Sequence, residues 1–348
     1  MTDLALREGT VVKTLKASGA VILGKTKTVE FALGATGVNE SRGTPWNPVD
    51  RQTHLMPGGS SSGSAVATSA GQVGFALGTD TGGSIRNPAC MTGIVGHKTT
   101  TGFWPLDGIF SLSTTLDSVG PLCRTVEDAA LLHQVFSGES VTPRNGVEGL
   151  RIGIVEDLFF DNLDSAVAAD FERVAEVLEA NGARRIRVEF PEVHERTELF
   201  SAIVPSELIH SITPERFLKI RDGVDTVTES RAAVGLETSA HAYLAAMNRR
   251  TSLIHKANET FNDVDLWLSP TVPVLPLPVN EFVDEKVHQR ALLASQNTQP
   301  GNLLDFCSVS IPMHKSGLPT GLQLMMPGGQ DARLLSIAAS VASLINAD

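Results

Sequence analysis

The chain has 348 residues, of which 42% are hydrophobic and 19% are charged, so it is long enough to fold around a large apolar core. Its formal net charge of −11 disfavours nucleic acids and anionic membranes as partners, because both are negatively charged. No apolar run reaches the roughly 18 residues of a membrane-spanning helix. Cys90, Cys123 and Cys307 are odd in number and lack metal-ligand spacing, which favours a reducing, cytoplasmic setting and no bound metal.

The first elements are short and lead into a polar loop. Apolar residues at helical spacing predict a helix over residues 9–18, and the apolar run Ala20–Gly24 predicts a buried strand. Capping-type residues predict that a helix begins within Thr26–Gly34. The polar stretch Asn39–Leu55 contains two prolines and is predicted to be a long surface loop.

The middle of the chain combines a strand, a loop and a capped helix. Gly71–Gly78 predicts a turn followed by a buried strand, and Gly102–Ser118 a loop. A helix is predicted over Thr125–Phe136, because Thr125 is a good N-cap and two acidic residues follow in the first turn. The polar residues 139–149 are the best candidate for an internal linker.

The second half begins with a strand–helix–strand pattern. Leu150–Val155 and Arg184–Phe190 read as strands, and Ser165–Ala180 between them as an amphipathic helix. This order predicts a parallel strand pair joined by a right-handed crossover. Residues 191–261 are predicted to be rich in helix.

The remaining elements complete the predicted sheet. Strands are expected within Asp265–Pro278, Val309–Pro312 and Gly321–Leu324, with a turn at Gly317 between the last two, and Asp331–Asn346 is an amphipathic helix. These elements predict an α/β fold of three layers, with a mixed central β-sheet flanked by helices.

Two glycine-flanked serine clusters, Pro57–Ala65 and Leu77–Pro88, dominate the sequence. Gly82 and Gly83 let a reacting carbonyl approach the backbone and aim several N–H groups at one point, so Ser84 is a candidate nucleophile. Such clusters also occur as flexible loops, and a glycine-rich turn before a helix can hold phosphate. The apolar surroundings oppose a linker, and no lysine follows the glycines as a nucleotide-binding loop requires.

The motifs are specific for one family. The runs GGSSSGSA at 58–65 and ALGTDTGGSIRNPA at 76–89, with further matches at Gly93–Thr99, Leu116–Pro121 and Leu318–Leu324, resemble the amidase signature family. The resemblance covers most of the chain. It implies a single large domain over residues 1–348 and cleavage of a carbon–nitrogen amide bond, or an ester, through a serine acyl-enzyme.

The resemblance also assigns site residues. It implies a Ser–cis-Ser–Lys triad in which Ser84 is the nucleophile and Ser60, after a cis peptide from Gly59, is the bridging serine. The oxyanion hole is implied to consist of the backbone N–H groups of Thr81, Gly82, Gly83 and Ser84. Two further positions implied to bind substrate are Thr79 and Arg86. The family needs no cofactor, and the implied partner is a small-molecule amide.

The lysine of the triad has no counterpart in this sequence. In the family it lies in an early strand with the pattern G-[VI]-P-x-x-[VI]-K-D, which does not occur here, and Lys25 and Lys98 match family positions outside the triad. We therefore expect an amidase without its N-terminal segment, with an open sheet edge and little or no activity. The alternative expectation is an inactive homologue that only binds a carboxylate or amide ligand, and a phosphate-binding module is the third.

Overall fold

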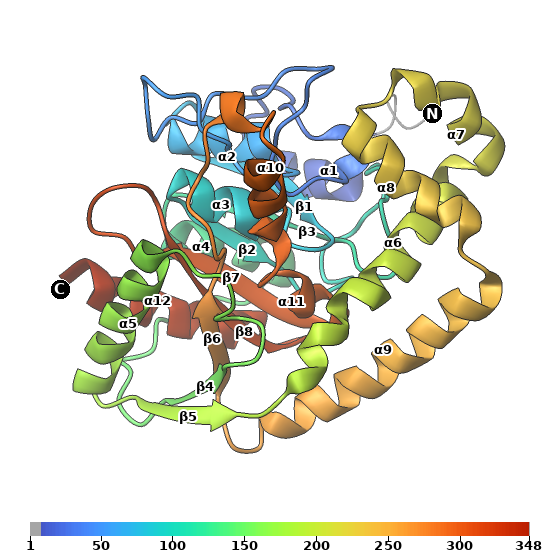
Figure 1. Cartoon of the computed structure of the whole chain (residues 1–348). Helices are drawn as coiled ribbons and strands as arrows, with labels where there is room; N and C mark the ends of the chain where they lie inside the picture. Colours follow the sequence, from blue (N-terminus) through green and yellow to red (C-terminus); the bar gives the residue numbers. More distant parts are fainter. Residues whose placement is uncertain (1–7, 348) are drawn as a thin grey trace.

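A mixed β-sheet forms the centre of the computed structural model, which describes residues 8–347 (Figure 1). Its eight strands follow the order β1-β3-β2-β7-β8-β6-β4-β5. The strands are β1 (Phe75–Asp80), β2 (Val95–Lys98), β3 (Ser118–Cys123), β4 (Arg151–Val155), β5 (Arg184–Val188), β6 (Leu266–Pro270), β7 (Phe306–Pro312) and β8 (Gly321–Pro327). β4 pairs in parallel with β5 and β6, whereas the other neighbours are antiparallel, so the predicted mixed sheet and the parallel β4–β5 pair are confirmed.

Helices cover both faces of the sheet, which confirms the predicted three layers (Figure 1). They are α1 (Thr10–Ala17), α2 (Ser62–Ser69), α3 (Arg86–Thr92), α4 (Val126–Ser137), α5 (Ser165–Ala180), α6 (Arg196–Ile212), α7 (Pro214–Ile220), α8 (Thr226–Glu237), α9 (Ala240–Thr260), α10 (Glu285–Leu292), α11 (Gln299–Leu303) and α12 (Asp331–Ala347). α4, α5 and α12 pack on one face, and α6 and α9 belong to the core on the other.

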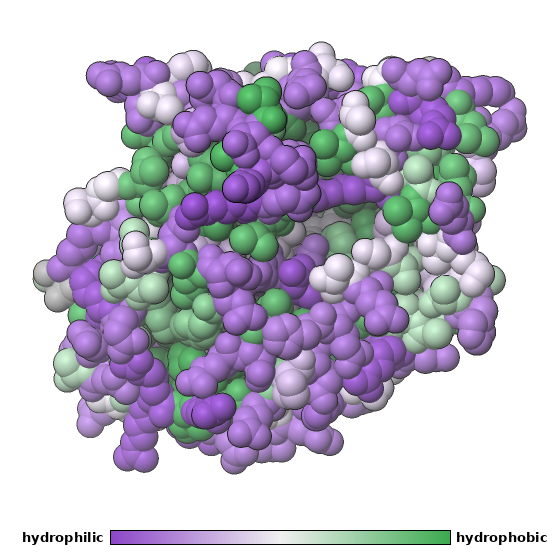
Figure 2. Space-filling view, in the orientation of Figure 1, coloured by the Kyte–Doolittle hydropathy of each residue, from purple (hydrophilic) through white to green (hydrophobic). Residues whose placement is uncertain are grey.

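Alternating strand residues supply these two cores, because successive side chains of a strand point to opposite faces. In β6, Leu266 and Leu268 join the core under α4, α5 and α12, whereas Trp267 joins the core under α6 and α9. Seen from one side, the surface is mostly hydrophilic, with hydrophobic residues in several small groups across it (Figure 2). Among the described residues, no helix is both long and apolar enough to cross a membrane.

Local signals explain why several predicted elements form. The Thr125 hydroxyl accepts the Asp128 N–H at 3.1 Å and begins α4, as its N-cap character predicted. The helix predicted over Ser165–Ala180 has the observed bounds of α5. Residues 139–149 form irregular chain rather than a free tether, because Ser336 Oγ of α12 donates to Thr142 O at 2.7 Å.

Two predicted elements near the N-terminus are wrong. Ala20–Gly24 is not a strand, and Val21 and Leu23 are 80% and 71% exposed. A strand needs a hydrogen-bonded neighbour, and Ala20–Gly24 pairs with no strand of the sheet. Thr26–Gly34 contains only a three-residue 3₁₀ turn, Glu30–Ala32, because two of its residues have left-handed backbone angles that interrupt a helix.

Candidate active site

A small cavity of about 40 Å³, called the Ser84 cavity below, is lined by residues of the second serine cluster, whereas Ser60 and the rest of the first cluster do not line it. β1 ends at Asp80, a glycine turn follows, and α3 begins at Arg86, so Ser84 lies between the strand and the helix. The other walls come from distant parts of the chain. The lining residues are Ala32, Leu33, Gly34, Ala35, Thr81, Gly82, Ser84, Asn87, Leu112, Phe200, Arg231, Ser295 and Gln299.

A buried ion pair holds the turn that carries Ser84. Asp80 Oδ1 accepts the Gly83 N–H at 2.7 Å, and Asp80 Oδ2 accepts the Ile85 N–H at 3.1 Å. Arg86 donates from Nε and Nη2 to the same carboxylate at 3.0 and 2.9 Å. Burial by itself raises the pKa of Asp80, but the Arg86 charge and hydrogen bonds outweigh burial and lower that pKa to about 2. The carboxylate is therefore ionised at neutral pH and fixes the turn from inside.

This arrangement changes the role of Arg86. Its remaining donors bind Gln323 Oε1 at 2.8 Å and Asn302 Oδ1 at 2.6 Å, and the residue is fully buried. The predicted contact with substrate does not fit this geometry, because every nitrogen of the guanidinium already has a partner. Arg86 instead supports the turn below Ser84.

The structure also places Thr79 outside the Ser84 cavity. Thr79 lies in β1 and lines a separate groove of about 220 Å³ between Leu77, Thr26 and Ile109. Its N–H donates to Ser61 Oγ at 3.3 Å. Neither of the two predicted substrate-binding residues is therefore brought to the cavity that contains Ser84.

The predicted oxyanion hole contains one N–H group that is already used. The Gly83 N–H donates to Asp80, whereas the N–H groups of Thr81, Gly82 and Ser84 donate to no other described residue. Gly83 has φ +122°, and a Cβ there would overlap Thr298 Oγ1, so this position requires glycine. Three of the four predicted donors thus stay available to a ligand.

Ser60 lies next to the Ser84 segment. The Gly59–Ser60 peptide is cis, as the resemblance predicted. The Ser61 N–H donates to Ser84 O at 3.2 Å, so the two serine clusters are joined through the backbone, and the Val29 N–H donates to Ser60 O at 3.1 Å. Ser60 is 1% exposed and Ser84 8% exposed. Neither hydroxyl hydrogen-bonds to another residue within 8–347, so a direct Ser60–Ser84 hydrogen bond is not part of this structure.

No lysine in the described part of the chain hydrogen-bonds to either serine. Lys98 is fully buried and donates to Phe306 O at 2.8 Å and to Thr99 O at 3.0 Å. Lys27 donates to Arg42 O at 2.7 Å, and Lys25 is exposed. Neither Lys25 nor Lys98 therefore contacts the two serines through a hydrogen bond, which agrees with the positions outside the triad that their sequence context predicted.

Sequence reasoning missed Arg231 of α8, which lines the Ser84 cavity from the far side. Its guanidinium makes no hydrogen bond or ion pair with the residues described here. Burial lowers the pKa of Arg231 and the Asp225 charge raises it, but a guanidinium stays protonated at neutral pH. No motif surrounds Arg231, so only the folded chain reveals a cation lining the same cavity as Ser84.

Comparisons with known proteins show the family of this chain. The sequence profile of the family described as Amidase matches residues 3–335. The chain belongs to the Amidase family. It is 37% identical to 2-amino-5-chloromuconic acid deaminase of Comamonas testosteroni over 97% of this chain and 75% of that protein. It is 35% identical to a glutamyl-tRNA(Gln) amidotransferase subunit of Acidothermus cellulolyticus, over 96% of this chain and 74% of that one.

Solved structures of the family have the same fold. A crystal structure of an amidase superposes with a TM-score of 0.88 at 32% identity, covering 97% of this chain and 77% of the other. The corresponding glutamyl-tRNA(Gln) amidotransferase subunit of Thermotoga maritima superposes with a TM-score of 0.82 at 32% identity, covering 97% and 76%. The predicted family and α/β fold are therefore confirmed.

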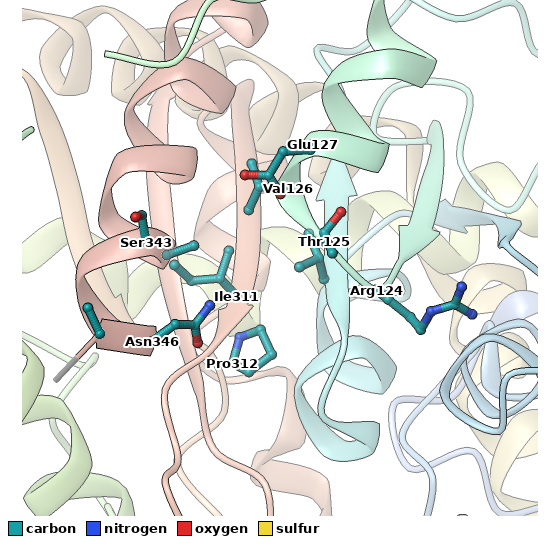
Figure 3. Close-up of a pocket in the computed structure, with 11 residues that line it drawn as sticks. Arg124, Thr125, Val126, Glu127, Ile311, Pro312, Ser343 and Asn346 are labelled. Atoms are coloured by element: carbon teal, nitrogen blue, oxygen red, sulfur yellow. The ribbon is translucent and has the colours of Figure 1, made fainter. Parts of the chain in front are cut away.

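Another hollow lies away from the Ser84 cavity. A pocket of about 520 Å³ separates the beginning of α4 from the end of α12, where Glu127 and Asn346 line it (Figure 3). It shares no residue with the Ser84 cavity. Within residues 8–347, no group of three or more His, Cys, Asp or Glu side chains could hold a metal ion.

Proposed function

We propose that this chain hydrolyses the carbon–nitrogen bond of a small linear amide that also carries a carboxylate, through an acyl-enzyme on Ser84. One observation carries this proposal: Ser84, Thr81, Gly82 and Arg231 line a single cavity, the backbone N–H groups of the first three have no partner among the described residues, and neither has the Arg231 guanidinium. The hydroxyl would supply the nucleophile, the N–H groups an oxyanion hole, and the guanidinium a carboxylate subsite.

The proposed reaction has two stages. Ser84 Oγ attacks the carbonyl carbon, while the N–H groups of Thr81, Gly82 and Ser84 stabilise the oxyanion. The proton of Ser84 Oγ goes to a base by way of Ser60, the relay that the family resemblance implies. The intermediate collapses as the carbon–nitrogen bond breaks, and the nitrogen takes up the proton as it leaves. Water then attacks the ester and releases the carboxylic acid and the free hydroxyl of Ser84. All of these steps use protein groups and water.

The proton from Ser60 needs an acceptor. The resemblance to the family implies a lysine as this base, and none of the described lysines hydrogen-bonds to Ser60 or Ser84. This observation favours a second candidate function for the 348-residue chain by itself, namely binding of a carboxylate or amide ligand without efficient turnover. Members of a triad act as a unit, so loss of the base removes most of the rate.

We infer a carboxylate in the substrate because Arg231 lines the cavity, and the name of one relative supports this. An arginine in a site enclosed by protein pairs with a carboxylate through two parallel hydrogen bonds. The Comamonas relative is named for its action on 2-amino-5-chloromuconic acid, which is itself a carboxylic acid. A small-molecule amide as the partner and a cytoplasmic location stay predictions.

The first test asks whether Ser84 is the reactive serine. A fluorophosphonate probe is applied to the chain and to a version that carries a family-like N-terminal segment with its lysine. We expect the lysine-bearing version to be labelled at Ser84 much faster, and Ser84→Ala to abolish labelling in both. Labelling that persists in Ser84→Ala would disprove the nucleophile, and equal amide turnover in the two versions would disprove the need for the added base.

The second test addresses the carboxylate subsite. Monoamides of short dicarboxylic acids are compared with the same amides in which a methyl ester replaces the free carboxylate. We expect the lysine-bearing version to prefer the free acid, and Arg231→Leu to lower kcat/KM for the acid by 10- to 100-fold with little change for the ester, as loss of about 1.5–3 kcal/mol requires. Exposed Arg216→Leu serves as the control for loss of a positive charge. Equal losses on both substrates would contradict the assignment.

A further inference from the structure

A buried carboxylate, Asp117, joins the Ser84 turn to a neighbouring loop. Its Oδ1 accepts the Thr81 hydroxyl at 2.5 Å. Its Oδ2 accepts the N–H groups of Leu112 and Ser113 at 3.0 and 3.1 Å and the Ser111 hydroxyl at 3.0 Å. Asp117 and Thr81 are only 3% and 1% exposed, so solvent does not compete for these hydrogen bonds.

The neighbouring loop is itself held in place by a second buried carboxylate. Glu207 of α6 accepts hydrogen bonds from the Ser113 hydroxyl, the Thr115 N–H at 3.1 Å, the Thr115 hydroxyl and, at 2.7 Å, the Tyr243 hydroxyl. α6 also carries Phe200, which lines the Ser84 cavity. The loop that presents Asp117 is therefore fixed to the helical layer, and Asp117 has a defined position relative to the cavity.

We infer that Asp117 is a positioning residue for the oxyanion hole: it fixes the Thr81 side chain and thereby aims the Thr81 N–H into the Ser84 cavity. This inference rests on the proposed function of that cavity. Thr81 follows the last residue of β1 and precedes two glycines, so neighbouring chain restricts it little on that side. The hydrogen bond from its hydroxyl to Asp117 supplies the missing constraint, because oxyanion donors act only when they are held in place beforehand.

The arrangement requires a carboxylate and not an amide. Donors approach both oxygens of Asp117, and a carboxylate accepts on both, whereas an asparagine would direct its NH₂ group at one set of donors. Burial raises the pKa of Asp117, and the hydrogen bonds from Thr81, Ser113, Ser111 and Leu112 oppose that rise. Both oxygens therefore take part in joining the turn to the loop.

Two hydrogen bonds to the same carboxylate provide a matched pair of variants. Thr81→Val removes the donor on the side of the oxyanion hole and keeps the shape and the backbone N–H. Ser111→Ala removes one donor on the opposite side, where the loop is still held by two backbone N–H groups. If Asp117 only stabilised the fold, the two variants would behave alike. Thr81→Ser restores the donor and is the conservative rescue.

The test uses phenylboronic acid on the full chain, with succinate as a ligand for Arg231. Ser84 Oγ adds to boron and its proton goes to buffer, which gives a tetrahedral adduct with an oxygen in the oxyanion position. By isothermal titration, we expect Thr81→Val to weaken phenylboronic acid binding by about tenfold or more. We expect Ser111→Ala and Thr81→Ser to stay within threefold of the unmodified chain, and succinate affinity to be unchanged in all three.

Each outcome bears on a different claim. If Thr81→Val binds phenylboronic acid as tightly as Ser111→Ala, or loses affinity for both ligands equally, Asp117 does not act on the oxyanion hole. If the unmodified chain does not bind phenylboronic acid while succinate binds, the proposed nucleophile is wrong and the inference fails with it. Thermal melting confirms that the variants are folded, and Thr81→Ala, which also lacks the donor, replaces Thr81→Val if that variant does not fold.

Discussion

Replacing Asp80 by asparagine is expected to lower the free energy of unfolding by about 3–5 kcal/mol, because it leaves buried positive charge without its partner. Asp80 and Arg86 are both fully buried, and the charge of Lys98 also acts on Asp80. Asparagine keeps the size of the side chain and removes its charge. The perturbation therefore isolates the electrostatic role of the carboxylate.

The hydrogen bonds support this magnitude. Each carboxylate oxygen of Asp80 accepts three donors: Oδ1 from Gly83 N, Arg86 Nη2 and Asn302 Nδ2, and Oδ2 from Ile85 N, Arg86 N and Arg86 Nε. An asparagine NH₂ would face three of them with a donor of its own. Leaving a buried donor without a partner costs about 1–3 kcal/mol, so one or two such losses reach the expected range.

The same carboxylate predicts how the effect depends on pH. The pKa of Asp80 falls from its ordinary 3.8 to about 2, which corresponds to about 2.4 kcal/mol. A carboxyl with a lowered pKa in the folded state contributes stability above pH 3.8 and loses it as the pH falls toward 2. The unmodified chain should therefore lose its advantage over Asp80→Asn between about pH 5 and pH 2, while other acids affect both proteins equally.

Urea denaturation followed by tryptophan fluorescence measures this difference, since Trp104 and Trp267 are buried. The control is Asp263→Asn, an exposed acid for which we expect a change within about 0.5 kcal/mol. A loss below about 1 kcal/mol for Asp80→Asn at pH 7 would refute the reasoning. A difference that stays constant between pH 5 and pH 2.5 would refute it as well.

Other predictions follow from single positions. Gly83→Ala should lower stability by about 1–3 kcal/mol in thermal melts, because its φ is +122° and a Cβ would overlap Thr298 Oγ1, whereas Gly74→Ala, which meets open space, should not. Thr125→Ala should cost about 1 kcal/mol in urea denaturation through loss of the N-cap of α4. Burial raises the pKa of Asp331, but the hydrogen bonds from His97 and Thr100 lower it to about 2. Asp331→Asn should therefore lose less stability than the unmodified chain as the pH falls from about 5 to 2. An unchanged dependence of stability on pH would contradict this.

The sheet edge shows where sequence and tertiary structure differ. Apolar residues at Ala20–Gly24 predicted a strand, yet Val21 and Leu23 are exposed. β1 was predicted to be buried but is only partly so, because one of its edges has no strand beside it within the described residues. Hydrophobicity identified residues suited to a strand, but a strand forms only when a partner satisfies its backbone groups.

By itself, the sequence determined the helix starts and turns that depend on neighbours along the chain. Thr125 caps α4 because its hydroxyl reaches an N–H three residues on, and the glycines before Ser84 permit a turn that few other residues allow. Only the tertiary structure decided that Arg231 lines the same cavity as Ser84, that the Arg86 guanidinium is buried, and that Asp117 accepts a hydrogen bond from Thr81. These contacts join residues that are far apart in the sequence. The sheet and its helices bring them together only after folding, so spacing in the sequence could not predict them.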